Sequence, residues 1–258
     1  MKKLVFCIPS YKRPVAVKTL ELFPDAIVYV AENEYAAYNE ANPDANIKSV
    51  PDGIQGNLCR IRNYILDDNV GSAVVVLDDD ISDIKRIEIF KESELKKFVS
   101  VPKEKIEDLF CSFADLCEEW GYSYFGVQIL PGPAVARSFA PFSTHSYIGG
   151  PIQGFLPDNT LRYDERLPLK EDYDMTLQQC NANRGCLRFN LYCYQAKQSE
   201  QTGGCACYRN LIREKEQLEL LQKKWGKKIV RWDTTNKTNG KMKNIDYNPI
   251  IKIPIGGI

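Results

Sequence analysis

Three consecutive carboxylates follow an apolar run, where Val74-Val75-Val76-Leu77 leads into Asp78-Asp79-Asp80-Ile81. An unbroken aliphatic run is typical of a strand covered on both faces, in the middle of a parallel sheet. Neighbouring acids stay ionised together only where they share a positive charge. Ligands of open α/β sheets lie at the carboxyl ends of strands, and Mg²⁺ or Mn²⁺ combines carboxylates with phosphate oxygens and water. The run indicates a metal site for a phosphate-bearing ligand or, alternatively, a solvated acidic turn.

A second acidic group, Glu171-Asp172, stands at the head of a predicted helix. A carboxylate there can take the proton of an acceptor hydroxyl as a general base. It can also serve only to cap the helix, because carboxylates stabilise a helix amino terminus. The glycines Gly149 and Gly150 are interpreted either as a strand bulge or as a pocket wall that permits close approach of a ligand.

Elements of alternating type must position these residues. We expect strands at residues 3–9, 26–31, 47–50 and 74–77, with helices at 15–23, 34–42 and 58–66 between them. This alternation predicts a doubly wound, parallel half-domain. No glycine-rich dinucleotide or phosphate-loop motif follows any strand. Later in the chain we expect strands at 84–90, 124–130 and 187–194, a strand pair within 145–156, helices at 102–120 and 208–225, a mobile tail at 233–243 and a strand or packed segment at 250–255.

Composition places few restrictions on function. The 258 residues, 44% hydrophobic and 26% charged, are typical of a soluble globular protein, and we expect residues 1–258 to form a single domain. No apolar run approaches membrane-spanning length, and the apolar start is too short for a signal peptide. The expected location is the cytoplasm, with no membrane partner. The nine cysteines lack a disulfide rhythm, so free thiols are the expectation and zinc binding around Cys205 and Cys207 the alternative.

Charge is unevenly distributed along the chain. Residues 209–243 contain eleven Lys and Arg and four Asp and Glu, a net charge of +7, so the remainder carries −7. This basic segment indicates attraction to a polyanion or, alternatively, a solvated helix face.

Four motifs in order, Ile8 to Pro14, Gly56 with Arg62-Asn63, Leu77 to Asp80 and Lys170 to Asp172, resemble the GT-A class of nucleotide-sugar glycosyltransferases. With Lys223-Lys224-Trp225-Gly226, the pattern is most similar to phage-type TET-associated glycosyltransferases, a family thought to add sugars to hydroxymethylated pyrimidines in DNA. The resemblance implies an α/β GT-A (Rossmann-like) fold with a mainly parallel central sheet flanked by helices.

The resemblance also implies residue roles. Asp78 and Asp80 would hold Mn²⁺ or Mg²⁺ against the donor diphosphate, and Asp172, preceded by Glu171, would supply the catalytic base of an inverting enzyme. The implied donor-binding residues are Pro9, Ser10, Arg13, Arg62, Asp79, Gly149 and Gly150. Many relatives place a further metal-binding histidine after the second acidic motif, whereas the single histidine here, His145, precedes it.

The expected function is therefore transfer of a sugar from a nucleoside-diphosphate sugar to a hydroxymethylpyrimidine such as hydroxymethylcytosine in bacteriophage DNA, in the host cytoplasm. Two alternatives stay open. The same fold could act on a glycan or lipid-linked saccharide, or the chain could be an inactive relative that binds nucleic acid.

Overall fold

The computed structural model describes residues 4–89, 96–129, 137, 139–196, 203–233 and 247–253. The amino-terminal half of its central sheet is parallel, since β3 pairs with β2, β2 with β1 and β1 with β4 in that sense. All five residues of β4 are buried, as its unbroken aliphatic run predicts. The acidic run therefore begins at the carboxyl edge of the sheet. The elements of this half are β1 (Leu4–Pro9), β2 (Ile27–Ala31), α1 (Tyr35–Ala41), β3 (Asn46–Val50), α2 (Leu58–Asp68) and β4 (Ala73–Leu77).

The sheet continues beyond β4 through strands from the second half of the chain. Its order is β3-β2-β1-β4-β9-β7-β10-β5-β6, with β8 also paired to β10. The pairings set β1, β2, β3, β4, β6, β7 and β10 in one direction and β5, β8 and β9 in the other. The added strands are β5 (Ile81–Ile89), β6 (Lys96–Ser100), β7 (Tyr124–Ile129), β8 (Phe142–Ser143), β9 (Ile152–Phe155) and β10 (Leu187–Ala196). The expected α/β fold with a mainly parallel central sheet is confirmed.

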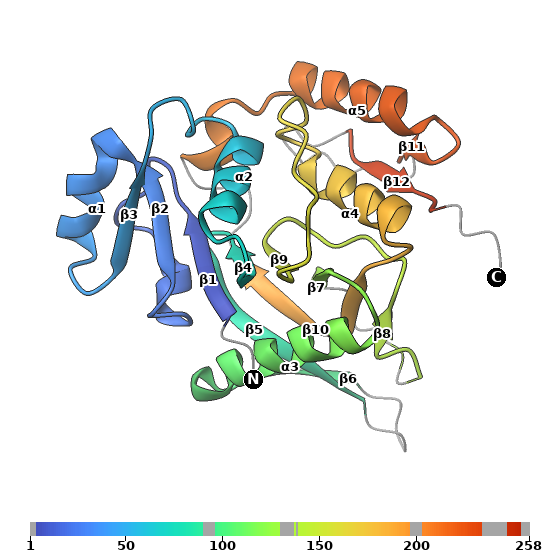
Figure 1. Cartoon of the computed structure of the whole chain (residues 1–258), viewed down its shortest axis with the longest axis horizontal. Helices are drawn as coiled ribbons and strands as arrows, with labels where there is room; N and C mark the ends of the chain where they lie inside the picture. Colours follow the sequence, from blue (N-terminus) through green and yellow to red (C-terminus); the bar gives the residue numbers. More distant parts are fainter. Residues whose placement is uncertain are drawn as a thin grey trace.

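Helices cover both faces of the sheet (Figure 1). Successive side chains of a strand point to opposite faces. Accordingly, Val75 and Leu77 of β4 pack in one cluster with α3 (Ile106–Glu119), and Val74 and Val76 pack in another with α2 and α4 (Glu171–Ala182). The sheet is thus a layer between α3 on one side and α2 and α4 on the other.

A smaller unit lies against the outside of α4. Leu218 and Leu221 of α5 (Leu211–Trp225) pack with Leu177 of α4 and with β11 (Val230–Trp232), which pairs with β12 (Pro249–Ile251). Lys224 donates hydrogen bonds to Asp164 and Asp174. Much of the basic carboxyl-terminal segment is therefore anchored to the helix that carries the second acidic motif.

Two predicted elements were wrong. The helix expected at 15–23 is a single 3₁₀ turn, η1 (Lys18–Glu21). Val15 is 88% exposed, while the Thr19 side chain donates to Asp78 O at 2.5 Å and accepts from Ile81 N at 3.0 Å. These bonds fasten the acidic loop and compete with helix hydrogen bonds.

The strand pair expected within 145–156 is the single strand β9, because the backbone before it, including Gly149 and Gly150, leaves the sheet. Strands β6 and β11 were not predicted. The helices expected at 102–120 and 208–225 begin later, after the 3₁₀ turns η3 (Lys103–Lys105) and η5 (Gly204–Cys207). A short 3₁₀ turn, η2 (Glu32–Glu34), also precedes α1. The tail expected at 233–243 lies, except for Asp233, outside the described residues.

Candidate active site

The acidic loop after β4 is held against the loop after β1. Ser10 Oγ donates to Asp79 Oδ2 at 2.6 Å, and Arg13 Nη1 lies 2.8 Å from Asp79 Oδ1. Asp79 is almost fully buried. Burial raises its pKa, while the charge of Arg13 and the Ser10 hydrogen bond oppose that rise. Three of the predicted donor-binding residues are thus brought together at the carboxyl edge of neighbouring strands.

Arg62 donates hydrogen bonds to both acidic motifs from the buried side of the site. The resemblance implied that Arg62 faces the donor, but its side chain is 0% exposed and does not line the neighbouring cavity. It donates to Asp78 Oδ1 at 2.8 Å and to Glu171 Oε1 at 3.1 Å. Its position on α2 explains the difference. Cys59, Ile61 and Ile65 of that helix are packed in the core, so the face of α2 that carries Arg62 is also buried.

One backbone segment connects these pairs to Asp172. Arg62 Nη2 also donates to Gly150 O at 2.9 Å, and Gly150 N donates to Asp172 Oδ2 at 3.0 Å. The same Asp172 oxygen accepts from the Tyr147 hydroxyl, and Oδ1 accepts from Tyr173 N at 2.8 Å. Asp78 and Asp172 are therefore held in a fixed relation although they are distant in sequence.

Glu171 and Asp172 differ in environment. Glu171 is buried, and burial together with the charge of Asp172 raises its pKa, which Arg62 opposes. Asp172 is partly exposed and its carboxylate lines the cavity. The arrangement suits Asp172 better than Glu171 for direct contact with a ligand.

Asp80 differs from Asp78 and Asp79, which each pair with an arginine. Its residue is 8% exposed, and no ion pair to it is found among the described residues. Burial, followed by repulsion from Asp78 and Asp79, raises the pKa of Asp80 to about 7. No group of three or more His, Cys, Asp or Glu in the described part of the chain is arranged to hold a metal. Two carboxylates suit a cation that takes its other ligands from phosphate and water, so Asp78 and Asp80 fit Mg²⁺ or Mn²⁺.

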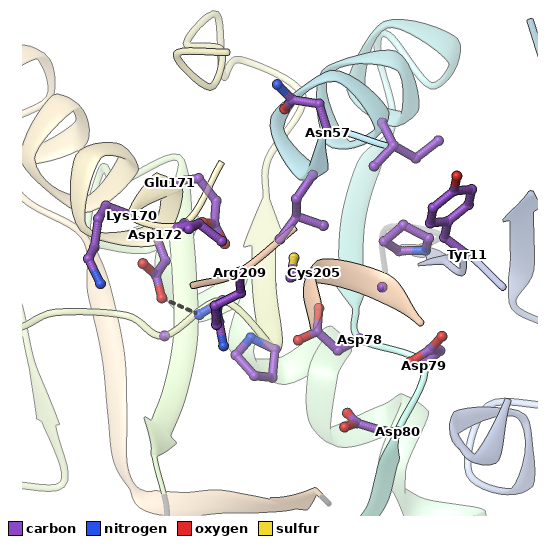
Figure 2. A pocket seen from close by; sticks show the side chains of 18 of the residues that line it. Tyr11, Asn57, Asp78, Asp79, Asp80, Lys170, Glu171, Asp172, Cys205 and Arg209 are labelled. Carbon is purple, nitrogen blue, oxygen red and sulfur yellow. Dashed lines mark hydrogen bonds between the residues drawn. The ribbon is translucent and has the colours of Figure 1, made fainter. Parts of the chain in front are cut away.

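The side chains of both acidic motifs line one cavity of about 500 Å³. Figure 2 shows Asp78, Asp79 and Asp80 on one side of it and Lys170, Glu171 and Asp172 on the other, with Arg209 between them. The predicted residues that line it are Pro9, Ser10, Arg13, Asp78, Asp79, Asp80, Gly149, Gly150, Glu171 and Asp172.

The two glycines form a wall of the cavity. A Cβ on Gly150 would lie 3.3 Å from Glu171 Oε1, and one on Gly149 would lie 3.0 Å from Ile129 Cγ1. Both positions thus have little room for a side chain.

Sequence reasoning missed several lining residues. Tyr11, Tyr147, Lys170, Cys205, Tyr208, Arg209 and Glu214 also face the cavity. The available signal was the start of the basic segment at Arg209, which was interpreted as a surface for a polyanion or as a solvated helix face. His145 contacts Thr144 and Arg184 O and does not line the cavity. All nine cysteines are free thiols.

Gly203 packs against the loop after β1. Its φ is 101°, and a Cβ there would lie 2.7 Å from Arg13 Cγ. Arg13 Nη2 donates to Gly203 O at 3.1 Å, and Gly204 N donates to Tyr11 O at 3.0 Å. The segment thus fixes the arginine that pairs with Asp79.

We expect Gly203→Ala to destabilise the fold by about 1–3 kcal/mol, because only glycine readily adopts this backbone conformation. We also expect it to weaken nucleotide-sugar binding by displacing Arg13. Gly226→Ala is the matched control, since Gly226 has φ of 89° but nothing within 4 Å of an added Cβ. Thermal unfolding and equilibrium binding separate the two effects. Unchanged affinity in Gly203→Ala would contradict the role given to this contact.

The fold and the acidic cavity define the class of protein. The structure superimposes with a TM-score of 0.51 on glucosyl-3-phosphoglycerate synthase from Mycobacterium tuberculosis, solved with Mn²⁺, UDP and glucosyl-3-phosphoglycerate, at 10% identity over 98% of this chain and 88% of that chain. A second structure of that synthase, with Mn²⁺, UDP and phosphoglyceric acid, gives 0.52 at 10% identity over 98% of this chain and 87% of that chain. The fold is that of GT-A glycosyltransferases.

The family model for TET-Associated Glycosyltransferase matches residues 8–204. The chain belongs to this family and is a glycosyltransferase. It is 26% identical over 247 residues to the beta-glucosyl-HMC-alpha-glucosyl-transferases of Enterobacteria phages T6 and T2, covering 90% of this chain and 84% of theirs. No helix among the described residues is long and apolar enough to cross a membrane.

Proposed function

We propose that the protein transfers a sugar from a nucleoside-diphosphate sugar to a hydroxyl group carried by a modified pyrimidine in DNA. The observation that carries the proposal is the meeting of Asp78, Asp80 and Asp172 at one cavity in a chain of this family. The names of the phage relatives include HMC, for hydroxymethylcytosine, and support that base as the acceptor. The solved relatives in complex with UDP and Mn²⁺ support a nucleotide-sugar donor and a divalent ion. The expected place of action is the cytoplasm of a phage-infected host.

The donor would occupy the side of the cavity next to the first strand. Pro9, Ser10 and Arg13 would receive the nucleoside, and Asp79 would contact the ribose or the sugar. Asp78 and Asp80 would hold Mn²⁺ or Mg²⁺, which when bound neutralises the charge that develops on the diphosphate. Gly149 and Gly150 would allow the sugar to approach closely. Arg62 would act only by fixing Asp78 and Glu171.

Asp172 would accept the proton of the acceptor hydroxyl. Its carboxylate faces the cavity, and the Tyr147 hydroxyl and Gly150 N fix its orientation. A base that activates the acceptor for direct displacement inverts the anomeric carbon, so we propose inversion. The phage relatives favour a second outcome, because they are named as alpha-glucosyl-transferases and an α-linked product from an α-linked donor requires retention. The anomeric proton coupling of the product distinguishes the two outcomes.

The experiment that tests the function is transfer of label from radioactive nucleotide sugars, with Mn²⁺, to four acceptors. These are DNA containing hydroxymethylcytosine, the same DNA after β-glucosylation, unmodified DNA and a saccharide. The phage relatives favour the β-glucosylated acceptor as a second candidate, since their names specify a β-glucosyl-HMC acceptor. Label on the saccharide alone would favour the alternative acceptor class. DNA binding without transfer from any donor would favour an inactive relative.

Metal dependence can be measured separately from turnover. We expect Asp80→Asn to weaken Mn²⁺ binding, measured in the presence of UDP by the electron paramagnetic resonance of free Mn²⁺, by more than about tenfold, since even outer-shell changes cost that much. Chelation should abolish transfer, and added Mn²⁺ should restore it. Asp25→Asn, at an exposed acid, is the control. Equal Mn²⁺ affinity in both variants would remove Asp80 from the metal site.

The basic segment is expected to attract DNA phosphates. Lys224 is unsuited to a test, because it donates to Asp164 and Asp174 and its reversal would disturb the fold. Lys227 and Lys228 are exposed. We expect their joint replacement by Glu to weaken DNA binding and to lower the salt slope by about 1 for each lysine that contacts a phosphate. Replacing Lys103 and Lys105, also exposed, is the matched control, and an equal effect of both pairs would argue against a specific DNA surface.

A further inference from the structure

The wall of the cavity opposite the acidic loop has a buried charge cluster of Lys170, Glu214 and Arg209. Lys170 and Glu214 form an ion pair, and their side chains are 2% and 1% exposed. Arg209 Nε lies 3.1 Å from the other Glu214 oxygen, Oε1. One carboxylate is therefore shared by two cations, and the cluster of Lys170, Glu214 and Arg209 carries a net positive charge.

The donors of Arg209 are largely unused. Its Nε is buried without a hydrogen-bond acceptor, because the ion-pair contact to Glu214 lacks hydrogen-bond geometry. Neither terminal nitrogen of its guanidinium donates a hydrogen bond to another described residue. The side chain is 33% exposed and lines the cavity. A planar guanidinium with free donors matches phosphate oxygens, which it can bind through two parallel hydrogen bonds.

The other two arginines at the site are committed to acids. Arg13 pairs with Asp79 and Arg62 with Asp78 and Glu171. Arg209 lies instead toward the side of the cavity that carries Glu171, whose charge acts on it, and Figure 2 shows it between Asp172 and Asp78. That is the region between the proposed metal ligands and the proposed base.

We propose that Arg209, positioned by the Lys170–Glu214 pair, binds the terminal phosphate of the donor diphosphate and neutralises it as the sugar departs. The inference rests on the proposed function. In that reaction the bond between the anomeric carbon and the diphosphate oxygen breaks, and its electron pair stays on the phosphate. The acceptor oxygen forms the new bond to the anomeric carbon, and its proton passes to Asp172. Arg209 neutralises the negative charge that develops on the leaving diphosphate.

The test compares binding of inorganic pyrophosphate, UDP, GDP and UMP, each with Mg²⁺, by calorimetry. Arg209→Gln is expected to weaken binding of pyrophosphate and of the preferred nucleoside diphosphate by about 10- to 100-fold, the value of hydrogen bonds to a charged group. Binding of UMP should change by no more than about threefold, as for a substitution away from the contact. Lys215→Gln, which removes a charge from the exposed side of α5, is the control and should change no affinity by more than about threefold.

The outcomes separate this inference from the proposed function. Wild-type affinity for pyrophosphate in folded Arg209→Gln, or an equal loss in Lys215→Gln, overturns the role of Arg209 and leaves the function standing. If Arg209→Gln does not fold, Arg209→Lys carries the test. It keeps the charge but loses the paired donors, so it should bind pyrophosphate several-fold more weakly, and unchanged binding overturns the inference. A wild-type protein that binds neither pyrophosphate nor either nucleoside diphosphate overturns the proposed function and the inference with it.

Discussion

Replacing Asp172 with Asn should lower the rate of sugar transfer by about 10²- to 10⁴-fold, the contribution of a positioned general base. An amide cannot accept the acceptor proton, although its carbonyl can still accept one of the hydrogen bonds that now reach the carboxylate. Rates under saturating donor and acceptor, measured with the DNA acceptor that the wild type labels best, give the change in turnover.

The fold should survive this substitution. The asparagine side chain keeps the size of the native one, and the expected loss of stability is about 1–3 kcal/mol from hydrogen bonds to Gly150 N and Tyr173 N that are weakened. Asp158→Asn, at an exposed acid, controls for the loss of one negative charge. A folded Asp172→Asn protein that turns over at the wild-type rate would show that the base is another group.

Replacing Arg62 with Met should lower the free energy of unfolding by about 3–5 kcal/mol, the cost of removing one partner from a buried ion pair. Burial lowers the pKa of Arg62, but the charges of Asp78 and Glu171 outweigh that effect and keep the guanidinium charged. Without it, Glu171 would be a buried carboxylate with no cation bonded to it. Gln153 Oε1 and Gly150 O would each lose a donor as well. Denaturation with urea measures the change.

A second substitution tests the cause of that loss. Adding Glu171→Gln to Arg62→Met removes the uncompensated charge, so the double variant should be more stable than Arg62→Met alone. Arg60→Met is the control, because Arg60 is on the same helix and, among the described residues, its terminal nitrogen donates only to Gly53 O. If Arg62→Met and Arg60→Met cost the same, the buried arginine does not hold the two acidic motifs together.

Local pattern was sufficient for the framework of this protein. The aliphatic run of β4, the apolar runs of β1, β2 and β3 and the stripe of Leu58, Ile61 and Ile65 on α2 each predicted an element that is present. The position of Asp78 at the end of a central strand followed from the same pattern. These features depend on residues near one another in sequence, where periodicity and turn chemistry report directly on structure.

Features that depend on partners distant in sequence could not be predicted from local pattern. The segment expected as a helix at 15–23 is one turn, because Thr19 bonds to the acidic loop some sixty residues later. Arg209 was interpreted as part of a basic surface, whereas Glu214 and the cavity determine its position. Helical spacing placed Arg62 on α2 but gave no sign that it is buried among the acids.

The sequence by itself determined the α/β framework, the carboxylates at the carboxyl edge of its sheet and, through its motifs, the glycosyltransferase family. Only the tertiary structure decided which charges meet. The Arg62–Glu171 contact joins residues 109 positions apart, and Gly150 links that pair to Asp172. Such contacts arise from the packing of α2, α4 and the loop before β9 around one cavity. A charged side chain carries no local signal of the partner that packing will bring to it, so the assembly of this site could be known only from the folded chain.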